Sequence, residues 1–441
     1  MNIAILGFGV EGQALADYFK RRKADITICD QNPKVHVPKH FKSQLGENAF
    51  SNLKNFDTIF KSPGIPSARV MDVPNLTTLT QYFFDHCPCP IIGVTGTKGK
   101  GTTATLIYHL LKDASQNAYL GGNIGIPPIT FLGKLKKKSI VILELSSFQI
   151  QGLTKSPHIG IILNVTSDHM DYHVSIEEYH AAKANLLKYQ TQNDIVVVNA
   201  DYKKSLEIGK KSQGKLFTVS TQRKVTLGAD IEEGKIYIKG PKTTIPILSI
   251  KQVGLIGPHN LENILPAVVV AYGLGVEPAS IKKTIQAFKG LPHRLELIAI
   301  QKKVAYYNDS FSTTPETSIA AIRAFKKPIH LIAGGSEKYS DFSEWAKVCV
   351  ETKNLKTIIL TGEKSAVRMA EALHITNAPE QKKHRPDLKI LHLLNLREAM
   401  IAAKTYAKAG DIVLLSPACA SFEEFNNYKE RGEVFKKFIF L

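Results

Sequence analysis

The chain is long enough for more than one hydrophobic core, and its composition excludes fibrous, disordered and membrane-spanning proteins. It has 441 residues, of which 44% are hydrophobic, and this length predicts about three domains. No apolar run is long enough to cross a bilayer, and a strand pattern begins where a signal peptide would need its apolar segment. The formal net charge is +18, but the lysines are dispersed and no nucleic-acid-binding module is present, so neither nucleic acid nor membrane is an expected partner.

Cysteine usage predicts a reducing compartment. The five cysteines are odd in number and are scattered without the spacing of a metal site. Because disulfides persist mainly in oxidising compartments, we expect free thiols and a cytoplasmic location.

The first predicted domain, residues 1–89, opens with a strand, a glycine turn, a helix over 13–22 and a strand over 25–30. A further strand ends in a turn at 62–64. The turn has the spacing of a dinucleotide fingerprint, which by itself asks only for a phosphate near a helix N-terminus. The residues that form this fingerprint are Gly7, Gly9, Gly12 and Asp30.

A phosphate-binding loop opens the second predicted domain, residues 90–291. An apolar strand runs into the glycine-rich turn of residues 96–101, and a helix is predicted over 102–114. Glycines let backbone N–H groups converge on an anion, to which the helix N-terminus adds a favourable dipole and Lys100 adds positive charge. The segment therefore predicts a nucleoside triphosphate site in an enzyme.

The loop departs from the strict P-loop pattern at two positions. Val94 stands where the first glycine belongs. Gly101 stands where the magnesium-binding hydroxyl belongs, which moves that hydroxyl to Thr102. A glycine-rich turn without a ligand is the structural alternative, but two lysines in an empty tight turn would serve no packing purpose.

The remaining strands of the second domain predict a parallel sheet. Short apolar runs at 139–145, 159–164 and 195–199 alternate with helical patterns, an order that is typical of parallel strands. Residues 214–250 change to short β-rich pieces and predict a small antiparallel addition.

Two acidic segments lie where this chemistry needs a metal. Glu144 ends an apolar strand, and a carboxylate close to a phosphate loop suits magnesium, which prefers hard oxygen ligands. Asp168, His169 and Asp171 follow another strand, at the edge where such folds bind ligands, but without the spacing of a closed zinc site. His169 is therefore a candidate either for a second magnesium or for substrate contact.

The third predicted domain, residues 292–441, is a second doubly wound unit in which strands alternate with helices. The fold class is therefore α/β in three domains. The first and third are Rossmann-like, and the central P-loop domain has a parallel sheet with a small β insert. The predicted strands of the third domain are 304–308, 329–333, 357–361, 390–394 and 412–416.

In order and spacing, these motifs resemble the Mur ligases, ATP-driven enzymes that form amide bonds, and among them the branch that adds glutamate. The compact phosphate loop is also similar to that of folylpolyglutamate synthetases in the same superfamily. Each motif is modest alone, but together they cover nearly the whole chain. The segments that carry the resemblance are 93–103, 122–125, 144–149, 168–171, 179–183, 257–263, 291–296, 308–310 and 415–422.

The resemblance implies ATP and two magnesium ions. Thr102, Glu144 and His169 would hold metal, and Lys100 would neutralise phosphate charge. Lys183 matches the lysine that the family carbamylates, and as a carbamate it would also be a metal ligand. The implied ATP-binding residues are Gly96, Thr97, Lys98, Gly99, Lys100, Gly101, Thr102, Thr103, Asn260, Asn263, Arg294 and Asp309.

The resemblance also assigns the other two substrates. The first domain would bind UDP-N-acetylmuramoyl-L-alanine, and the third domain would bind glutamate, whose two carboxylates need cationic and N–H donors. The implied UDP-sugar residues are Gly9, Val10, Asp30, Gln31, Ser62, Pro63, Gly64, Asn123 and His169. The implied amino-acid residues are Thr313, Lys338, Ser421, Phe422 and Tyr428. The implied catalytic residues are Lys100, Glu144, His169, Lys183 and Lys338.

The implied activity is ATP-dependent ligation by a monomer in cytoplasmic peptidoglycan precursor synthesis. The alanyl carboxylate would attack ATP to give an acyl phosphate and ADP, and the amine of D-glutamate would then displace phosphate. Keeping water from the acyl phosphate implies closure of the third domain over the second. A nicotinamide-dependent oxidoreductase would leave Lys100 and Glu144 unused, and a non-catalytic nucleotide-binding protein would leave Lys183 and Lys338 unexplained.

One departure bears on the amino acid. After Asn308-Asp-Ser310 the glutamate-adding branch continues with lysine, whereas this chain has Phe311. Divergent relatives with a Thr-Thr-Pro segment, as at residues 313–315, include some that take L-glutamate. D-Glutamate is the prediction, with L-glutamate or, more remotely, a folylpolyglutamate-synthetase-like reaction as the alternative.

Overall fold

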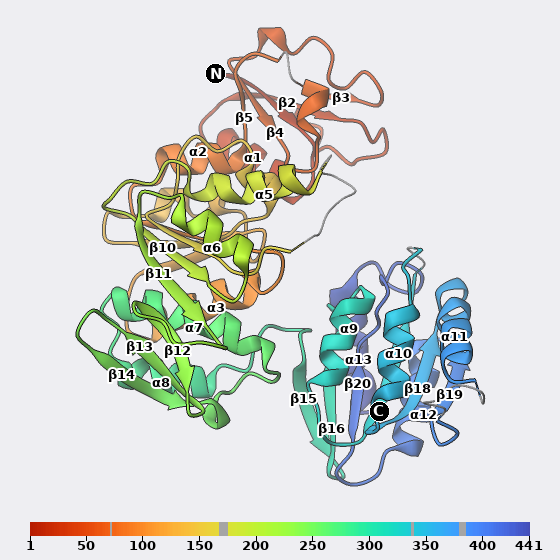
Figure 1. Ribbon diagram of the computed structural model, residues 1–441. Coiled ribbons are helices and arrows are strands. Elements are labelled where there is room, and N and C mark those ends of the chain that lie inside the picture. The colour runs from red at the N-terminus through yellow and green to blue at the C-terminus, as the bar shows by residue number, and fades with distance from the viewer. Residues whose placement is uncertain (71–72, 167–174, 337–338, 379–384) are drawn as a thin grey trace. The chain divides into compact units, whose positions relative to one another are not determined.

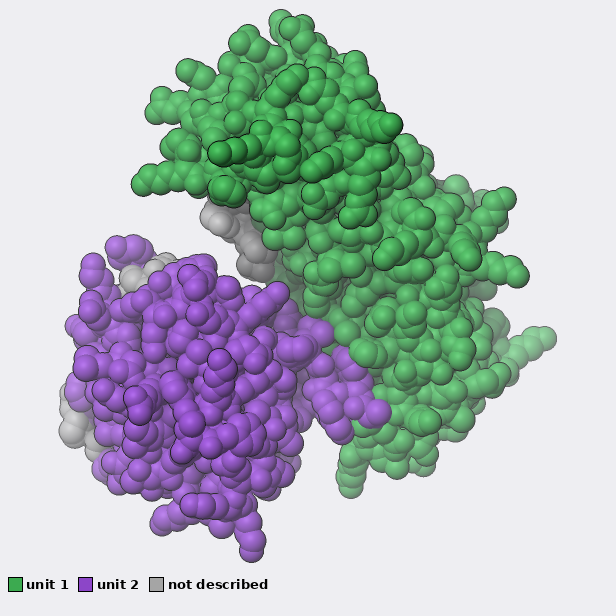
Figure 2. All heavy atoms as spheres, turned by 180° about the vertical axis from the view of Figure 1, so that it is seen from behind, with its two compact units in different colours: residues 1–253, 261–286 green, residues 254–260, 287–441 purple. Residues whose placement is uncertain are grey.

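A computed structural model describes residues 1–70, 73–166, 175–336, 339–378 and 385–441 (Figure 1). They form two compact units (Figure 2): the first comprises residues 1–253 and 261–286, and the second comprises residues 254–260 and 287–441. Both units are α/β structures, as the sequence predicts. No helix within these described ranges has both the length and the apolar character needed to span a bilayer.

The N-terminal part of the first unit is a parallel sheet of five strands in the order β3-β2-β1-β4-β5. The predicted strand over 25–30 is confirmed. The predicted helix over 13–22 begins earlier, at Val10, because Gly9 has extended backbone and already serves as its N-cap. The elements are β1 (Asn2–Leu6), α1 (Val10–Lys20), β2 (Asp25–Asp30), β3 (Lys42–Leu45), β4 (Thr58–Lys61), β5 (Leu76–Thr77) and α2 (Leu79–His86).

The central sheet has nine strands in the order β14-β13-β12-β11-β10-β9-β6-β8-β7. Residues 214–250 are only partly the antiparallel addition that the sequence predicts. The chain passes from β10 to β11 through helix α6, and such a crossover makes the two strands parallel. Only β12, β13 and β14 pair antiparallel, and they extend the same sheet. The strands are β6 (Ile91–Thr95), β7 (Ala118–Gly122), β8 (Ile140–Glu144), β9 (Ile159–Ile162), β10 (Ile195–Asn199), β11 (Lys215–Ser220), β12 (Gly228–Glu232), β13 (Lys235–Lys239) and β14 (Thr244–Ser249). The helices are α3 (Lys100–Asp113), α4 (Ser147–Ile150), α5 (Ile176–Ala184), α6 (Lys203–Lys210), α7 (His259–Gly273) and α8 (Pro278–Ala287).

One hydrophobic cluster runs through both sheets of the first unit. It includes Ile5 of β1, Phe83 of α2 and Leu143 of β8, all of them buried. A polar contact adds to it, because Gln149 Nε2 donates to Glu11 Oε1 at 2.7 Å. A shared core explains why the first two predicted domains form a single compact unit.

The second unit is a three-layer structure around a sheet in the order β15-β16-β20-β17-β18-β19. Only the edge strand β15 is antiparallel to its neighbour. Helices α9, α10 and α11 pack on one face, and α12 and α13 pack on the other (Figure 1). The elements are β15 (Glu296–Gln301), β16 (Val304–Asn308), α9 (Pro315–Arg323), β17 (Ile329–Gly334), α10 (Ser343–Glu351), β18 (Leu355–Thr361), α11 (Lys364–Thr376), β19 (Lys389–Leu393), α12 (Leu396–Tyr406), β20 (Ile412–Leu415) and α13 (Tyr428–Ile439).

A buried carboxylate ties β16 to β20. Asp309 is 4% exposed. Its Oδ1 accepts from Leu295 N at 3.1 Å, and its Oδ2 accepts from Ser416 Oγ at 2.8 Å. Burial raises the pKa of Asp309 to about 6, against the opposing effect of these hydrogen bonds.

This raised pKa predicts a pH-dependent stability of the second unit. The folded state holds the proton more tightly than the unfolded state, so the stabilisation is complete below the ordinary value of 3.8 and is lost as pH rises through about 6. Relative to Asp309→Asn, the wild type should gain on the order of 1–3 kcal/mol in free energy of unfolding between pH 7 and pH 4. Urea titrations at several pH values measure this, and parallel curves for the two proteins would contradict it.

Candidate active site

The phosphate loop lies between β6 and α3, at the C-terminal edge of the central sheet. Gly99 is the N-cap residue of α3 and has a φ of 87°. A Cβ at this position would lie 2.0 Å from Asn263 Oδ1. Only glycine fits, because the left-handed backbone and the close approach of Asn263 both exclude a side chain. The helix therefore begins at Lys100, two residues before the predicted start.

Two residues outside the loop hold it, one through its backbone and one through the side chain of Thr97. The N–H groups of Thr97 and Lys98 donate to the backbone and side-chain oxygens of Asn164, both at 2.7 Å. Thr97 Oγ1 lies 3.1 Å from the hydroxyl of Tyr179, on α5. The sequence assigned no role to Asn164 or Tyr179. An asparagine two residues after β9, which pairs with β6, is the signal that could have identified the first.

The two predicted lysines meet at one carbonyl. Lys100 Nζ donates to Gly96 O at 2.9 Å and to Thr97 O at 3.0 Å. Lys183, on α5, is 1% exposed, and its Nζ also donates to Gly96 O at 2.9 Å. The structure therefore brings together positive charges that are 83 positions apart in the sequence (183 − 100).

The candidate metal ligands lie beside this loop. Glu144 ends β8, where it pairs with Val94 of β6. It is 5% exposed, and its carboxylate makes no hydrogen bond or ion pair with the described residues. The hydroxyl of Thr103 donates to Asn263 O at 3.1 Å, which favours Thr102 as the metal-binding hydroxyl. A buried carboxylate of this kind beside a phosphate loop fits magnesium.

The other predicted metal ligand, His169, lies outside the described residues. Within the described ranges, no group of three His, Cys, Asp or Glu side chains is arranged to hold a metal. Among the described residues, the candidate donors are therefore the carboxylate of Glu144 and the hydroxyl of Thr102, to which a carbamate at Lys183 would add oxygens.

At the C-terminal edge of the first sheet, the structure brings the glycine turn, Asp30 and Ser62 together. Asp30 Oδ2 accepts from Phe8 N at 2.8 Å, and Ser62 Oγ lies 3.3 Å from Gly7 O. Gly9 begins α1 there. Because these groups surround a helix N-terminus, the edge suits an anionic ligand such as a diphosphate.

Three of the remaining predicted UDP-sugar residues are more exposed or are bonded to groups outside the glycine turn. Val10 is 71% exposed. Gln31 Oε1 accepts from Arg69 at 2.6 Å. Asn123 is exposed after β7, and its N–H donates to Glu144 O at 2.9 Å. The turn at 62–64 is supported by Lys61, which the sequence missed: it is buried, and its Nζ donates to Ile65 O at 2.7 Å.

The predicted ATP-binding residues are divided between the two units. The phosphate loop and Asn263 belong to the first unit, whereas Asn260, Arg294 and Asp309 belong to the second. Asn260 is 9% exposed, and its Nδ2 donates to Ile256 O at 2.7 Å.

Phe311, which stands where the resemblance leads us to expect a lysine, contacts two other predicted site residues. The guanidinium of Arg294 lies 3.7 Å from the centroid of the Phe311 ring, a cation–π contact. The same ring meets Tyr428 edge-on, with centroids 4.9 Å apart. Phe311 thus contacts one predicted ATP-binding residue and one predicted amino-acid-binding residue.

A buried arginine that the sequence missed organises this edge. Arg431, on α13, is 4% exposed and donates to Ser310 Oγ at 3.0 Å, Ser310 O at 2.9 Å, Cys419 O at 3.1 Å and Ala420 O at 3.0 Å. Burial lowers its pKa to about 10. It joins the turn after β16 to the loop after β20. No sequence signal marks it, because an arginine in an amphipathic helix normally faces solvent.

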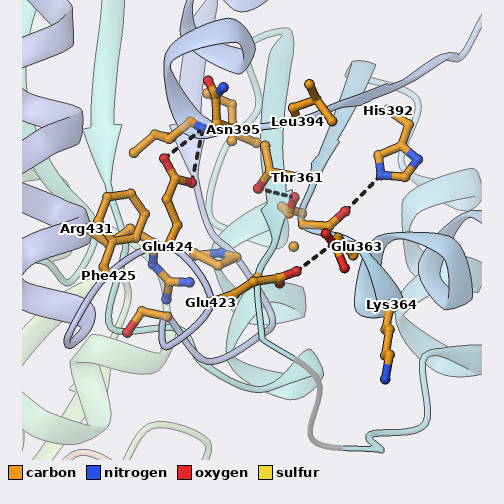
Figure 3. A pocket seen from close by; sticks show the side chains of 18 of the residues that line it. Thr361, Glu363, Lys364, His392, Leu394, Asn395, Glu423, Glu424, Phe425 and Arg431 are labelled. Atoms are coloured by element: carbon orange, nitrogen blue, oxygen red, sulfur yellow. Dashed lines mark hydrogen bonds between the residues drawn. The ribbon is translucent and has the colours of Figure 1, made fainter.

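A cavity of about 780 Å³ opens at the C-terminal ends of β17, β18, β19 and β20 (Figure 3). Ser421 lines it and is 4% exposed, whereas the neighbouring Phe422 is 69% exposed. Thr313 is half-buried in the turn before α9. Lys338 lies outside the described residues. A cavity of this size at a sheet edge is large enough for an amino acid.

The strained loop geometry predicts the effect of Gly99→Ala. A non-glycine residue at this φ costs about 1–2 kcal/mol, and the added Cβ displaces Asn263. We expect lower thermal stability and a KM for ATP raised by roughly tenfold, because small displacements of binding groups are costly. Gly152→Ala is the matched control, since no atom lies within 4 Å of the added Cβ. Equal kinetics for the two variants would refute the role of Gly99.

Three family models match successive parts of the chain. Residues 1–76 match the "Mur ligase MurD-like, N-terminal domain", residues 94–271 match the "Mur ligase middle domain", and residues 293–419 match the "Mur ligase, glutamate ligase domain". Among curated proteins, UDP-N-acetylmuramoylalanine–D-glutamate ligase of Acetivibrio thermocellus is 35% identical, covering 99% of this chain and 96% of that protein. The ligase of the same name from Clostridium tetani is 32% identical with the same coverage.

Solved structures support the fold. The MurC ligase of Thermotoga maritima superposes with a TM-score of 0.63 at 16% identity, covering 99% of this chain and 98% of that one. The MurF ligase of the same organism, in complex with ADP, gives a TM-score of 0.61 at 17% identity, covering 99% and 94%. The family models and the curated relatives confirm the family that the sequence indicated: the chain belongs to the Mur ligases, in their MurD-like branch.

Proposed function

We propose that this protein is an ATP-dependent ligase that joins D-glutamate to UDP-N-acetylmuramoyl-L-alanine. The observation that carries the proposal is the phosphate loop, where Lys100 and Lys183 meet at Gly96 O beside the buried carboxylate of Glu144. The names of the curated relatives support the choice of substrates. The reaction belongs to the synthesis of peptidoglycan precursors.

The loop binds and orients the triphosphate. The N–H groups at the N-terminus of α3 face the phosphates, and Lys100 moves from the loop carbonyls to neutralise them. Glu144 and Thr102 would hold magnesium, which would supply charge neutralisation at the transferring phosphoryl group. We propose a second ion, with His169 and a carbamate at Lys183 among its ligands.

The first sheet binds the diphosphate of the UDP-sugar at the N-terminus of α1, around Gly9, Asp30 and Ser62. The alanyl carboxylate of this substrate attacks the γ-phosphate of ATP, which yields an acyl phosphate and ADP. The amine of glutamate then attacks the acyl carbon, and phosphate leaves. Each step depends on the orientation of reactants, which rigid strand ends and helix N-termini provide.

Glutamate is bound by the second unit. Ser421 at the wall of the cavity, Thr313 and Tyr428 contribute hydrogen-bonding groups, and Lys338 contributes a cation. Two further features are part of the proposal: the protein acts in the cytoplasm, and it acts as a monomer.

The substrate assignment is tested by phosphate release with ATP, magnesium and UDP-N-acetylmuramoyl-L-alanine, in parallel with D-glutamate and L-glutamate. We expect release that depends on D-glutamate, and loss of that release in Lys100→Ala. Release with L-glutamate alone would keep the ligase chemistry and replace the amino acid. No release with either would refute the proposed function.

The contact between Phe311 and Arg294 predicts a specific kinetic defect. Phe311→Leu keeps apolar bulk but removes the ring face, so Arg294 loses a contact that is worth roughly a two- to fivefold change in affinity. We expect a KM for ATP raised by that factor, measured by coupled ADP release at saturating UDP-sugar and glutamate. Phe311→Tyr keeps the ring and should therefore have the KM for ATP of the wild type. A defect of equal size in both variants would contradict the cation–π role.

A further inference from the structure

The loop at residues 421–425 borders the cavity of the second unit and carries two adjacent carboxylates. Both reach the N-termini of helices that line the cavity (Figure 3). These helices, α11 and α12, follow β18 and β19, so the loop after β20 is joined to two other strand ends of the same sheet.

Glu423 is bonded to the start of α11. Its Oε1 accepts from the N–H of Glu363, the N-cap residue of that helix, at 2.9 Å. The preceding Gly362 has a φ of 94°, and a Cβ there would lie 2.8 Å from Glu423 Oε2. The approach is therefore close enough that a side chain at residue 362 would obstruct it.

Glu424 is bonded to the start of α12. Both of its oxygens accept from the N–H of Leu396, the first residue of that helix, at 3.4 and 3.3 Å. The N-cap residue Asn395 already accepts from Glu398 N at 3.0 Å. The loop carboxylate thus satisfies an N–H group that the helix's own cap leaves open.

Both contacts pair a carboxylate with the positive end of a helix dipole, and such charge-assisted hydrogen bonds are stronger than neutral ones. Just before this loop, the carbonyls of Cys419 and Ala420 accept hydrogen bonds from the guanidinium of Arg431. The loop is therefore fixed on both sides of Ser421 and Phe422. The residues before them are bonded to Arg431, and the two carboxylates directly after them are bonded to the helices.

We propose that Glu423 and Glu424 are positioning residues for the incoming amino acid. They hold the loop so that Ser421 stays in the cavity wall and Phe422 stays exposed beside it. The proposal rests on the proposed function, because Ser421 and Phe422 bind glutamate only if the protein is the ligase described above. Neither carboxylate touches substrate; each acts through the loop.

The test compares Glu423→Ala/Glu424→Ala with Glu423→Gln/Glu424→Gln. The alanine variant loses both contacts, so its KM for glutamate should rise by about tenfold, the scale expected for lost charge-assisted hydrogen bonds. Its KM for ATP should stay within about twofold of wild type. The glutamine variant keeps an acceptor oxygen at each position, so it should recover most of the affinity for glutamate.

Glu398→Ala is the matched control. Glu398 accepts from Leu394 N at 3.1 Å at the same end of α12, but it belongs to that helix and does not hold the loop. A control that raises the KM for glutamate as much as the alanine variant would overturn the proposal, because the effect would then be loss of helix capping. So would an unchanged KM in the alanine variant.

Hydrogen exchange supplies a readout that does not depend on activity. In the alanine variant, peptides that contain the amides of Glu363 and Leu396 and the loop 421–425 should exchange faster than in wild type. Unchanged exchange would show that the carboxylates do not hold the loop, and would overturn the proposal. If wild type releases no phosphate with either glutamate, the proposed function fails, and exchange still decides whether the loop is held.

Discussion

The left-handed turn at Gly99 is the constraint on which the first unit's chemistry depends. It lets α3 begin immediately after the loop, so that the helix N-terminus and Lys100 face the same place. The turn and the close approach of Asn263 are both possible because residue 99 is a glycine. Asn164 and Tyr179 hold the rest of the loop, from the neighbouring strand and from α5. A loop bound from three directions is preorganised, which reduces the cost of ordering it around phosphates.

The predicted sites share one architectural cause. In a parallel sheet all strands deliver their C-terminal residues to one edge, where the following helices present their N-termini. The sheet edge around Asp30, where we propose UDP-sugar binding, the phosphate loop and the cavity beside Ser421 are three instances of this arrangement. In the second unit, buried hydrogen bonds of Asp309 and Arg431 also connect strand ends that are far apart in the sequence. Such buried polar contacts stabilise only when every partner is in place.

Phe311 shows how a departure from a family pattern is accommodated. A lysine at this position would add a charge beside Arg294, whereas the phenylalanine offers its ring face to the guanidinium and its edge to Tyr428. Phenylalanine therefore supplies ring contacts to Arg294 and Tyr428 where lysine would supply a positive charge.

The sequence alone predicted the family, the α/β fold class and many candidate site residues at the edges of the sheets. Strands such as 25–30, 195–199 and 304–308 were predictable because hydrophobic periodicity is local. The phosphate loop was predictable because the spacing of its glycines, together with Lys100, is typical of a phosphate-binding turn. Only the tertiary structure shows the hydrogen bonds that join distant segments. They run from Lys183 to Gly96, from Arg431 to the turn after β16 and the loop after β20, and from two helix N-termini to Glu423 and Glu424. These contacts depend on where whole strands and helices end in space, and neither composition nor spacing along one chain encodes that position.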